Sequence, residues 1–145
     1  MERRDFIKST CIACASVSGL GAISSLLSGC TPLASLKTSS VNNMISIPES
    51  SFIANQTILL VKNSQSDYDI LLVKKKDNTY NALYMQCSHE NQPLTATKSG
   101  LFCASHGSAF DLEGNVTVQP ATKALKRYKT ITENNSITIY LNQIQ

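Results

Sequence analysis

From residue 44 onward, apolar residues fall in short runs that turn residues separate. Runs at 57–62, 69–75 and 79–85 are rich in Leu, Ile, Val and Tyr, and segments 63–66 and 76–78 between them hold Asn, Asp and Ser. Such a pattern is typical of consecutive β-strands. The later runs, with hairpin-type turns at 113–115 and 133–135, lie at 101–103, 108–111, 116–118, 127–132 and 136–141. No segment here keeps a helical period over a dozen residues, so the sequence predicts an all-β fold.

The first residues of the chain have a different pattern, that of an export signal. Arg3, Arg4 and Lys8 precede an uncharged, moderately apolar stretch that runs to Thr31. The order of residues resembles the twin-arginine signal, with Phe6 in its usual place and Glu2 where Ser or Thr is usual. This signal serves proteins that are exported after folding.

The uncharged stretch ends in a pattern for lipid attachment. Leu27-Ser28-Gly29-Cys30 resembles the lipobox of bacterial lipoproteins, in which the Cys thiol is acylated and the chain is cut before it. We therefore expect residues 1–29 to be a signal peptide and Cys30 to carry a lipid that holds the protein at a membrane. The alternative is an uncleaved transmembrane anchor over residues 9–28, whose Ser, Thr and Gly dilute its apolarity.

Residues 30–43 are rich in Ser, Thr and Asn and predict a lipidated N-terminus followed by a flexible tether. The folded domain is expected over 44–145. These features together predict an exported protein, lipid-anchored on the periplasmic side of a bacterial membrane, with the inner and the outer membrane both open.

Charge narrows the choice of partners. The chain has 13 basic and 10 acidic residues, and without residues 1–29 the balance is 10 − 8 = +2. The basic residues form no stripe with interleaved aromatic residues, so we expect no nucleic-acid partner.

The candidate chemistry lies in two short pairs. The chain has two histidines, His89 and His106, and each follows one of the two cysteines of the predicted domain, Cys87 and Cys103. Both pairs follow apolar runs, so they are expected on loops at one end of a sheet. Thiolates and imidazoles at such spacing can converge on one metal site, although a single Cys87–Cys103 disulfide stays open at this point.

The mixed composition of the pairs favours one kind of metal centre. Structural zinc sites usually pair Cys with Cys and His with His. A Rieske [2Fe–2S] cluster has two Cys on one iron and two His on the other, so that each loop supplies one residue of each type.

The sequence resembles the Rieske family over about residues 45–142. The matching motifs are C-S-H at 87–89, C-A-S-H-G-S-A-F-D at 103–111, and then Gly114 and Pro120-Ala121. The resemblance implies an antiparallel β-sandwich with a small cluster-binding subdomain formed by two loops. It also implies one [2Fe–2S] cluster per chain, with metal ligands at Cys87, His89, Cys103 and His106.

The resemblance assigns roles to further residues of the site. Gly107 is expected to let the backbone approach the cluster, Ser108 to donate a hydrogen bond to a bridging sulfide, and a loop around Pro120 to cover one flank. The members that serve quinol-oxidising complexes have two more cysteines and a Tyr, where this chain has Gln92, Ser105 and Phe110. Loss of the Tyr donor, together with the negative charge of Glu90, predicts a reduction potential below that of those members.

The resemblance implies single-electron transfer without a catalytic site of its own. Rieske oxygenases need a second iron site made of two His and a carboxylate, and both histidines are already used. The expected partners are a c-type cytochrome, a larger oxidoreductase subunit or a quinol. The alternative is a non-redox, zinc-binding β-sandwich surface lipoprotein, which leaves the mixed pairs unexplained.

Overall fold

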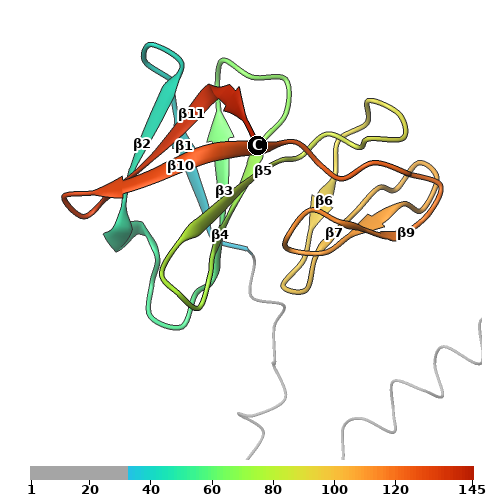
Figure 1. Ribbon diagram of the computed structural model, residues 1–145, viewed down its shortest axis with the longest axis horizontal. Coiled ribbons are helices and arrows are strands. Elements are labelled where there is room, and N and C mark those ends of the chain that lie inside the picture. The colour runs from blue at the N-terminus through green and yellow to red at the C-terminus, as the bar shows by residue number, and fades with distance from the viewer. Residues whose placement is uncertain (1–32) are drawn as a thin grey trace, which may run out of the picture. The chain divides into compact units, whose positions relative to one another are not determined.

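Two β-sheets make up the part of the chain that the structure, a computed structural model, describes, residues 33–145 (Figure 1). The larger sheet contains β1 (Ser35–Thr38), β3 (Ile58–Asn63), β4 (Ile70–Lys74), β5 (Tyr80–Tyr84), β10 (Arg127–Glu133), β11 (Ser136–Ile144) and β2 (Met44–Pro48), in this spatial order. The smaller sheet contains β6 (Thr95–Ala96), β7 (Leu101–Phe102), β8 (Ala109–Phe110) and β9 (Val116–Val118). A short 3-10 turn, η1 (Glu49–Ser51), follows β2. The all-β prediction is confirmed.

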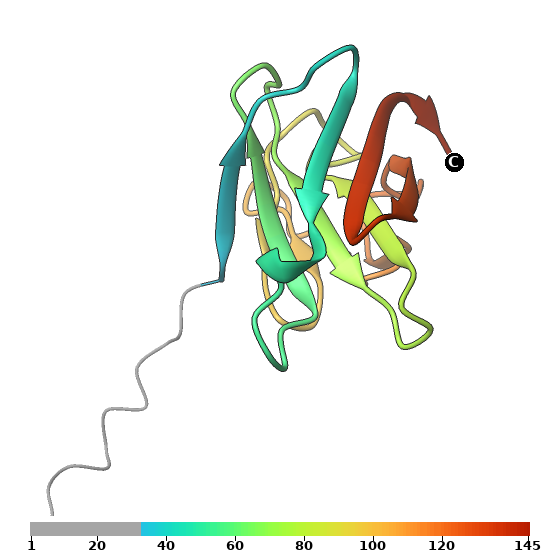
Figure 2. The ribbon, with the colours of Figure 1, turned by 90° about the vertical axis from the view of Figure 1, so that its left-hand side faces the viewer.

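The larger sheet curls until its two edges are neighbours. All of its strand pairs are antiparallel except β1 with β3. A tight turn at Asn42 and Asn43, with φ of 52° and 60°, joins the edge strands β1 and β2 (Figure 2). Asn tolerates this left-handed conformation better than most residues do. The result is a nearly closed sheet with an inner and an outer face.

Strand β1 differs from the sequence-based expectation. Its residues belong to the segment 30–43, for which we expected a flexible tether, but they pair with β3 in register. Of the four residues of the strand, Leu36 alone packs against the inner core, together with Ala34 just before the strand. Because its order comes from pairing with β3, a strand that is distant in the sequence, nothing in the local pattern predicts it.

Strands β3, β4 and β5 are buried on both faces, which explains their nearly continuous apolar sequence. Alternate residues point to the inner core, where they meet Ile45 and Ile47 of β2 and Ile137 and Ile139 of β11. The other residues of the three strands face outward and contribute to a second core. That outer core includes Ile58, Leu71, Val73, Leu83 and Met85.

The outer core joins the larger sheet to a smaller lobe, residues 86–126, that contains the smaller sheet. Leu94, Leu101, Phe110 and Leu125 of this lobe pack on the outer face of β3, β4 and β5. The strands of the lobe are two or three residues long and serve mainly to present loops. In Figure 1 the smaller lobe lies at one end of the molecule, with β6, β7 and β9 labelled.

The predicted runs coincide with β3, β4, β5 and β7 to β11 to within a few residues. The predicted turns are confirmed as well, since Gly114, Asn134 and Asn135 have positive φ. Among residues 33–145 no helix is long and apolar enough to cross a membrane. The predicted export signal, the lipid site at Cys30 and the alternative anchor all lie outside the described residues.

Candidate metal centre

The first Cys-His pair lies on a loop over residues 86–93, between β5 and β6, which we call the first loop. The backbone N–H of Cys87 donates to the carbonyl of Gln92 at 2.8 Å, and the N–H of Leu94 donates to Met85 at 3.0 Å. These bonds close the loop at its base. As a result Cys87 faces inward and is buried, whereas His89 lies at the tip and is exposed.

The second pair lies on a hairpin loop over residues 103–108, between β7 and β8, which we call the second loop. The N–H of Cys103 donates to Ser108 O at 2.8 Å, and the N–H of Gly107 donates back to Cys103 O at 3.0 Å. Gly107 has φ of +81°, a conformation that glycine adopts without strain. A Cβ at this position would meet no atom within 4 Å, so the backbone conformation of the loop itself is a reason for glycine here.

The two thiols lie together in the interior. Cys87 and Cys103 are 1% and 2% exposed, and both are free, so the disulfide alternative is excluded. Burial raises the pKa of the Cys103 thiol. Hydrogen bonds oppose this effect and outweigh it, so that the net pKa is lowered; they come from the backbone N–H of Ser105, the Cys87 thiol, the N–H of His106 and the Ser105 hydroxyl. Several donors directed at one sulfur favour the thiolate, which is the form that binds metals.

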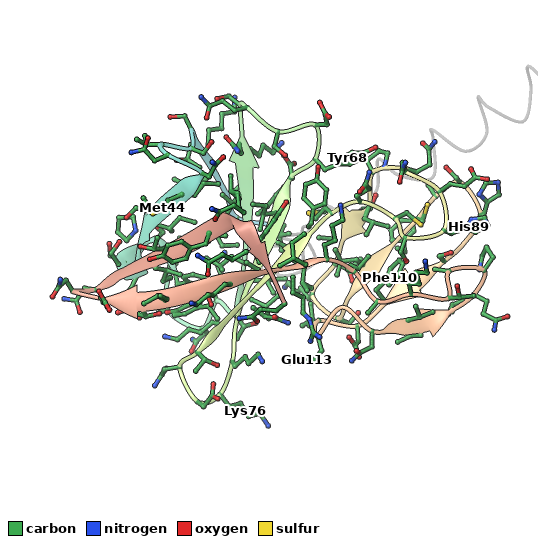
Figure 3. The ribbon with its side chains drawn as sticks, turned by 45° about the horizontal axis from the view of Figure 1, so that its top comes forward. Met44, Tyr68, Lys76, His89, Phe110 and Glu113 are labelled. Carbon is green, nitrogen blue, oxygen red and sulfur yellow. The ribbon has the colours of Figure 1, made fainter. Side chains whose placement is uncertain are left out.

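The two imidazoles lie together at the surface. The ring centroids of His89 and His106 are 5.2 Å apart, with the rings nearly perpendicular. Figure 3 shows His89 at the outer end of the smaller lobe, beyond Phe110. Glu90 is beside them, with Oε2 3.7 Å from Nδ1 of His106. The structure therefore brings all four predicted ligand residues to one end of the molecule, thiols inside and imidazoles outside.

A third loop, residues 119–126, is bonded to both of the others. The hydroxyl of Ser108, which is fully buried, accepts a hydrogen bond from the N–H of Ala121 at 3.0 Å. The hydroxyl of Ser88 donates to the carbonyl of Lys123 at 2.5 Å. Pro120, joined to Gln119 by a cis peptide bond, stands exposed at the start of this loop. Sequence reasoning missed Ser88, because a serine that binds a distant main-chain carbonyl leaves no pattern in the sequence.

Comparison with known families identifies the domain. A family model described as the Rieske [2Fe–2S] domain matches residues 45–129, more than half of the chain. The chain belongs to the Rieske [2Fe–2S] domain family. The cofactor that this family implies is a [2Fe–2S] cluster and not the zinc ion of the alternative hypothesis.

Solved structures share the fold of this Rieske domain. The plasma membrane Rieske protein PetC3 from the cyanobacterium Synechocystis PCC 6803 matches with a TM-score of 0.55 and 20% identity, over 66% of this chain and 97% of that one. A chain of the complex of reduced oxygenase and oxidized ferredoxin in carbazole 1,9a-dioxygenase matches with a TM-score of 0.52 and 16% identity, over 71% and 96%. Naphthalene 1,2-dioxygenase matches with a TM-score of 0.56 and 16% identity, over 69% of this chain but 26% of that one. Comparison with curated protein sequences finds no match.

The residues of the site fit the cofactor. The donor set contains two thiols and two imidazoles, the types that a Rieske cluster requires. The buried Ser108 hydroxyl accepts a hydrogen bond, and among residues 33–145 no hydrogen bond uses its own hydrogen, which is thus left to donate. Family and fold together support a Rieske-type electron carrier or an oxygenase component.

Proposed function

We propose that Cys87, His89, Cys103 and His106 hold the [2Fe–2S] cluster of this domain, and that the protein transfers single electrons. The observation that carries the proposal is the arrangement of the four side chains, two thiols buried side by side and two imidazoles exposed side by side. Each of the first two loops supplies one of each. A Rieske cluster takes up and releases one electron at a time.

The division between inside and outside suits an electron carrier. The buried thiols and the surrounding apolar residues exclude water from one side of the site, and the exposed imidazoles offer the other side to a partner. The N–H groups of Ser105 and His106 are directed at the Cys103 sulfur, and we assign the remaining donor of Ser108 to the cluster, so the chain provides donors that stabilise negative charge there. We assign Gly107 and the loop at Pro120 to the wall of the site, as the family resemblance implies.

We infer that the protein is a carrier or a small subunit with no catalytic site of its own. The chain has two histidines, and the proposed cluster uses both, so none is left for a second iron site of the oxygenase kind. The partners that fit are a c-type cytochrome, a larger oxidoreductase subunit or a quinol.

We further infer that the protein is exported and lipid-anchored through Cys30 on the periplasmic side of a membrane. The twin-arginine pattern and the lipobox support this, and the matching PetC3 is described as a plasma membrane protein. Four residues, 31–34, separate Cys30 from β1. The Cα atoms of Cys30 and Ser35 can therefore be at most about 18 Å apart, so the lipid would keep the larger sheet close to the membrane surface.

The ligand proposal is tested by iron and sulfide analysis of the anaerobically purified full chain and of four variants, each with one proposed ligand changed to Ala. We expect two irons and two sulfides per chain in the wild type and loss of the native cluster in every variant. Asn91→Ala is the matched control, because this exposed side chain lies in the first loop and no hydrogen bond among residues 33–145 uses it. A native cluster in any of the four variants would remove that residue from the ligand set.

The anchor proposal is tested by Cys30→Ala in cells given a radiolabelled fatty acid. The wild type should carry the label and remain with membranes after a carbonate wash, and the variant should do neither while keeping its cluster. If the variant stays in the washed membranes, the protein is held by another device, such as an uncleaved anchor over residues 9–28.

A further inference from the structure

Tyr68 reaches from the larger sheet to the first loop. It lies in the connection between β3 and β4, and its hydroxyl donates to the main-chain carbonyl of Asn91 at 2.6 Å. Asn91 follows His89 by two residues. Figure 3 shows Tyr68 between the larger sheet and the smaller lobe.

The position of the Tyr68 ring is fixed by one ring contact and by a hydrogen bond to its backbone. It packs edge-on against Tyr84 of β5, with ring centroids 5.4 Å apart, and Tyr84 packs in the same way on Tyr128 at 5.7 Å. The hydroxyl of Ser66 donates to the carbonyl of Tyr68 at 2.9 Å, which fixes the backbone there. The position of the phenol is therefore set by contacts that do not involve the first loop.

The first two loops differ in how they are attached. The second loop is held within the smaller lobe, through its own backbone bonds and through Ser108. The first loop has an equivalent bond within the lobe, from Ser88 to Lys123. In the described part of the chain, the bond from Tyr68 is the one side-chain hydrogen bond that joins this loop to the larger sheet.

We propose that Tyr68 is a positioning residue for the His89 side of the metal centre, and that it acts by holding the first loop through the Asn91 carbonyl. This inference rests on the ligand set proposed above. Without the phenolic hydroxyl, the tip of the loop is free to sample more positions while Cys87 stays in the core. The cluster should then show a wider spread of ligand geometries and should be lost more readily when the loop opens.

The test uses Tyr68→Phe in the full chain, because this change keeps the ring packing and removes only the hydroxyl. Two controls are matched to it. Tyr84→Phe removes a hydroxyl from the same ring cluster, where no hydrogen bond of the described residues uses it. Asn91→Ala changes the side chain of the acceptor residue and leaves the accepting carbonyl in place.

Three quantities are compared: the EPR line width of the reduced cluster, the rate of iron loss to a chelator, and the urea midpoint of the clusterless chain. For Tyr68→Phe we expect broader lines and iron loss faster by about fivefold, the factor that one ordinary hydrogen bond contributes to a local opening equilibrium. Both controls should match the wild type. The urea midpoint of the clusterless chain should move little, because the larger sheet keeps its packing.

The proposal is overturned if Tyr68→Phe matches the two controls. It is also overturned if line width stays normal while the urea midpoint falls, because Tyr68 would then support the fold in general rather than the metal centre. A wild type without a histidine-ligated [2Fe–2S] signal would instead contradict the proposed function, and the two failures are therefore distinguishable.

Discussion

The larger sheet and the smaller lobe reach order by different means. The larger sheet has strands of four to nine residues with apolar cores on both faces of β3, β4 and β5. The smaller lobe has strands of two or three residues, and its buried residues include the two thiols of the proposed metal centre. We expect burial of apolar surface to stabilise the larger sheet without help, and the smaller lobe to rely on the proposed metal centre for part of its order.

Contacts at the junction hold the base of the smaller lobe on the larger sheet. Beside the shared outer core, Lys75 pairs with Glu113 at 3.3 Å, and the amide of Asn81 donates to the carbonyl of Leu112 at 3.3 Å. These contacts attach one side of the smaller lobe, and the Tyr68–Asn91 bond attaches the other. The smaller lobe can thus loosen at its loops while its base stays on the sheet.

Removal of the cluster should produce the largest difference in local stability between the smaller lobe and the larger sheet. After chelation of iron from the reduced full chain, we expect amide hydrogen exchange in residues 86–126 to speed up by at least about tenfold, since the four proposed ligand side chains lose their common partner. Exchange in β3, β4 and β5 should stay within about twofold of its rate in the intact protein. Equal acceleration in both regions would show that the domain depends on the cluster as a whole.

A cavity in the inner core should have the opposite distribution of effects. Leu72 is fully buried in the larger sheet, on the face away from the smaller lobe. Leu72→Ala should lower the free energy of unfolding by about 3 kcal/mol, measured by urea denaturation, and leave the EPR spectrum unchanged. The matched control is Leu60→Ala in β3, where the half-buried side chain should cost less. A changed EPR spectrum in Leu72→Ala would contradict the separation of the two regions.

Ser108→Ala should affect the metal centre through a single hydroxyl. The change removes the acceptor for the N–H of Ala121 and the donor that we assign to the cluster. Reduction adds negative charge that this donor stabilises, so its loss should lower the reduction potential by about 60 mV, equivalent to about 1.4 kcal/mol for one electron. Ser88→Ala is the control, since its hydroxyl binds the third loop at Lys123 instead. An unchanged potential in Ser108→Ala would remove the assigned bond.

Glu90→Gln should produce the smallest change. The carboxylate lies 3.7 Å from the imidazole of His106, but the two side chains are 54% and 47% exposed and solvent screens their interaction. Loss of the negative charge should raise the potential by about 20 mV at low salt. The difference from the wild type should shrink at 1 M salt, where the screening length is about 3 Å. A lowered potential would mean that Glu90 acts other than through its charge.

The sequence predicts well where local pattern decides the structure. Apolar runs gave β3, β4 and β5, since residues buried on two faces are apolar almost without interruption. The Cys-His pairs predicted a metal centre because ligand types and spacing are set by the metal. Strand β1 was missed because its polar residues are ordered by a distant partner. Tyr68 and Ser88 were missed for a related reason, since each binds a main-chain carbonyl and side-chain type does not identify such an acceptor.

The central claim is that two thiols and two imidazoles of this chain hold one [2Fe–2S] cluster. The most direct test is pulsed EPR of the dithionite-reduced full chain at low temperature, which detects the nitrogen nuclei bound to iron. The account predicts a rhombic signal with a lower average g value than an all-cysteine cluster and with couplings to two histidine nitrogens. A reduced cluster without nitrogen coupling, or a colourless protein with stoichiometric zinc, would contradict it.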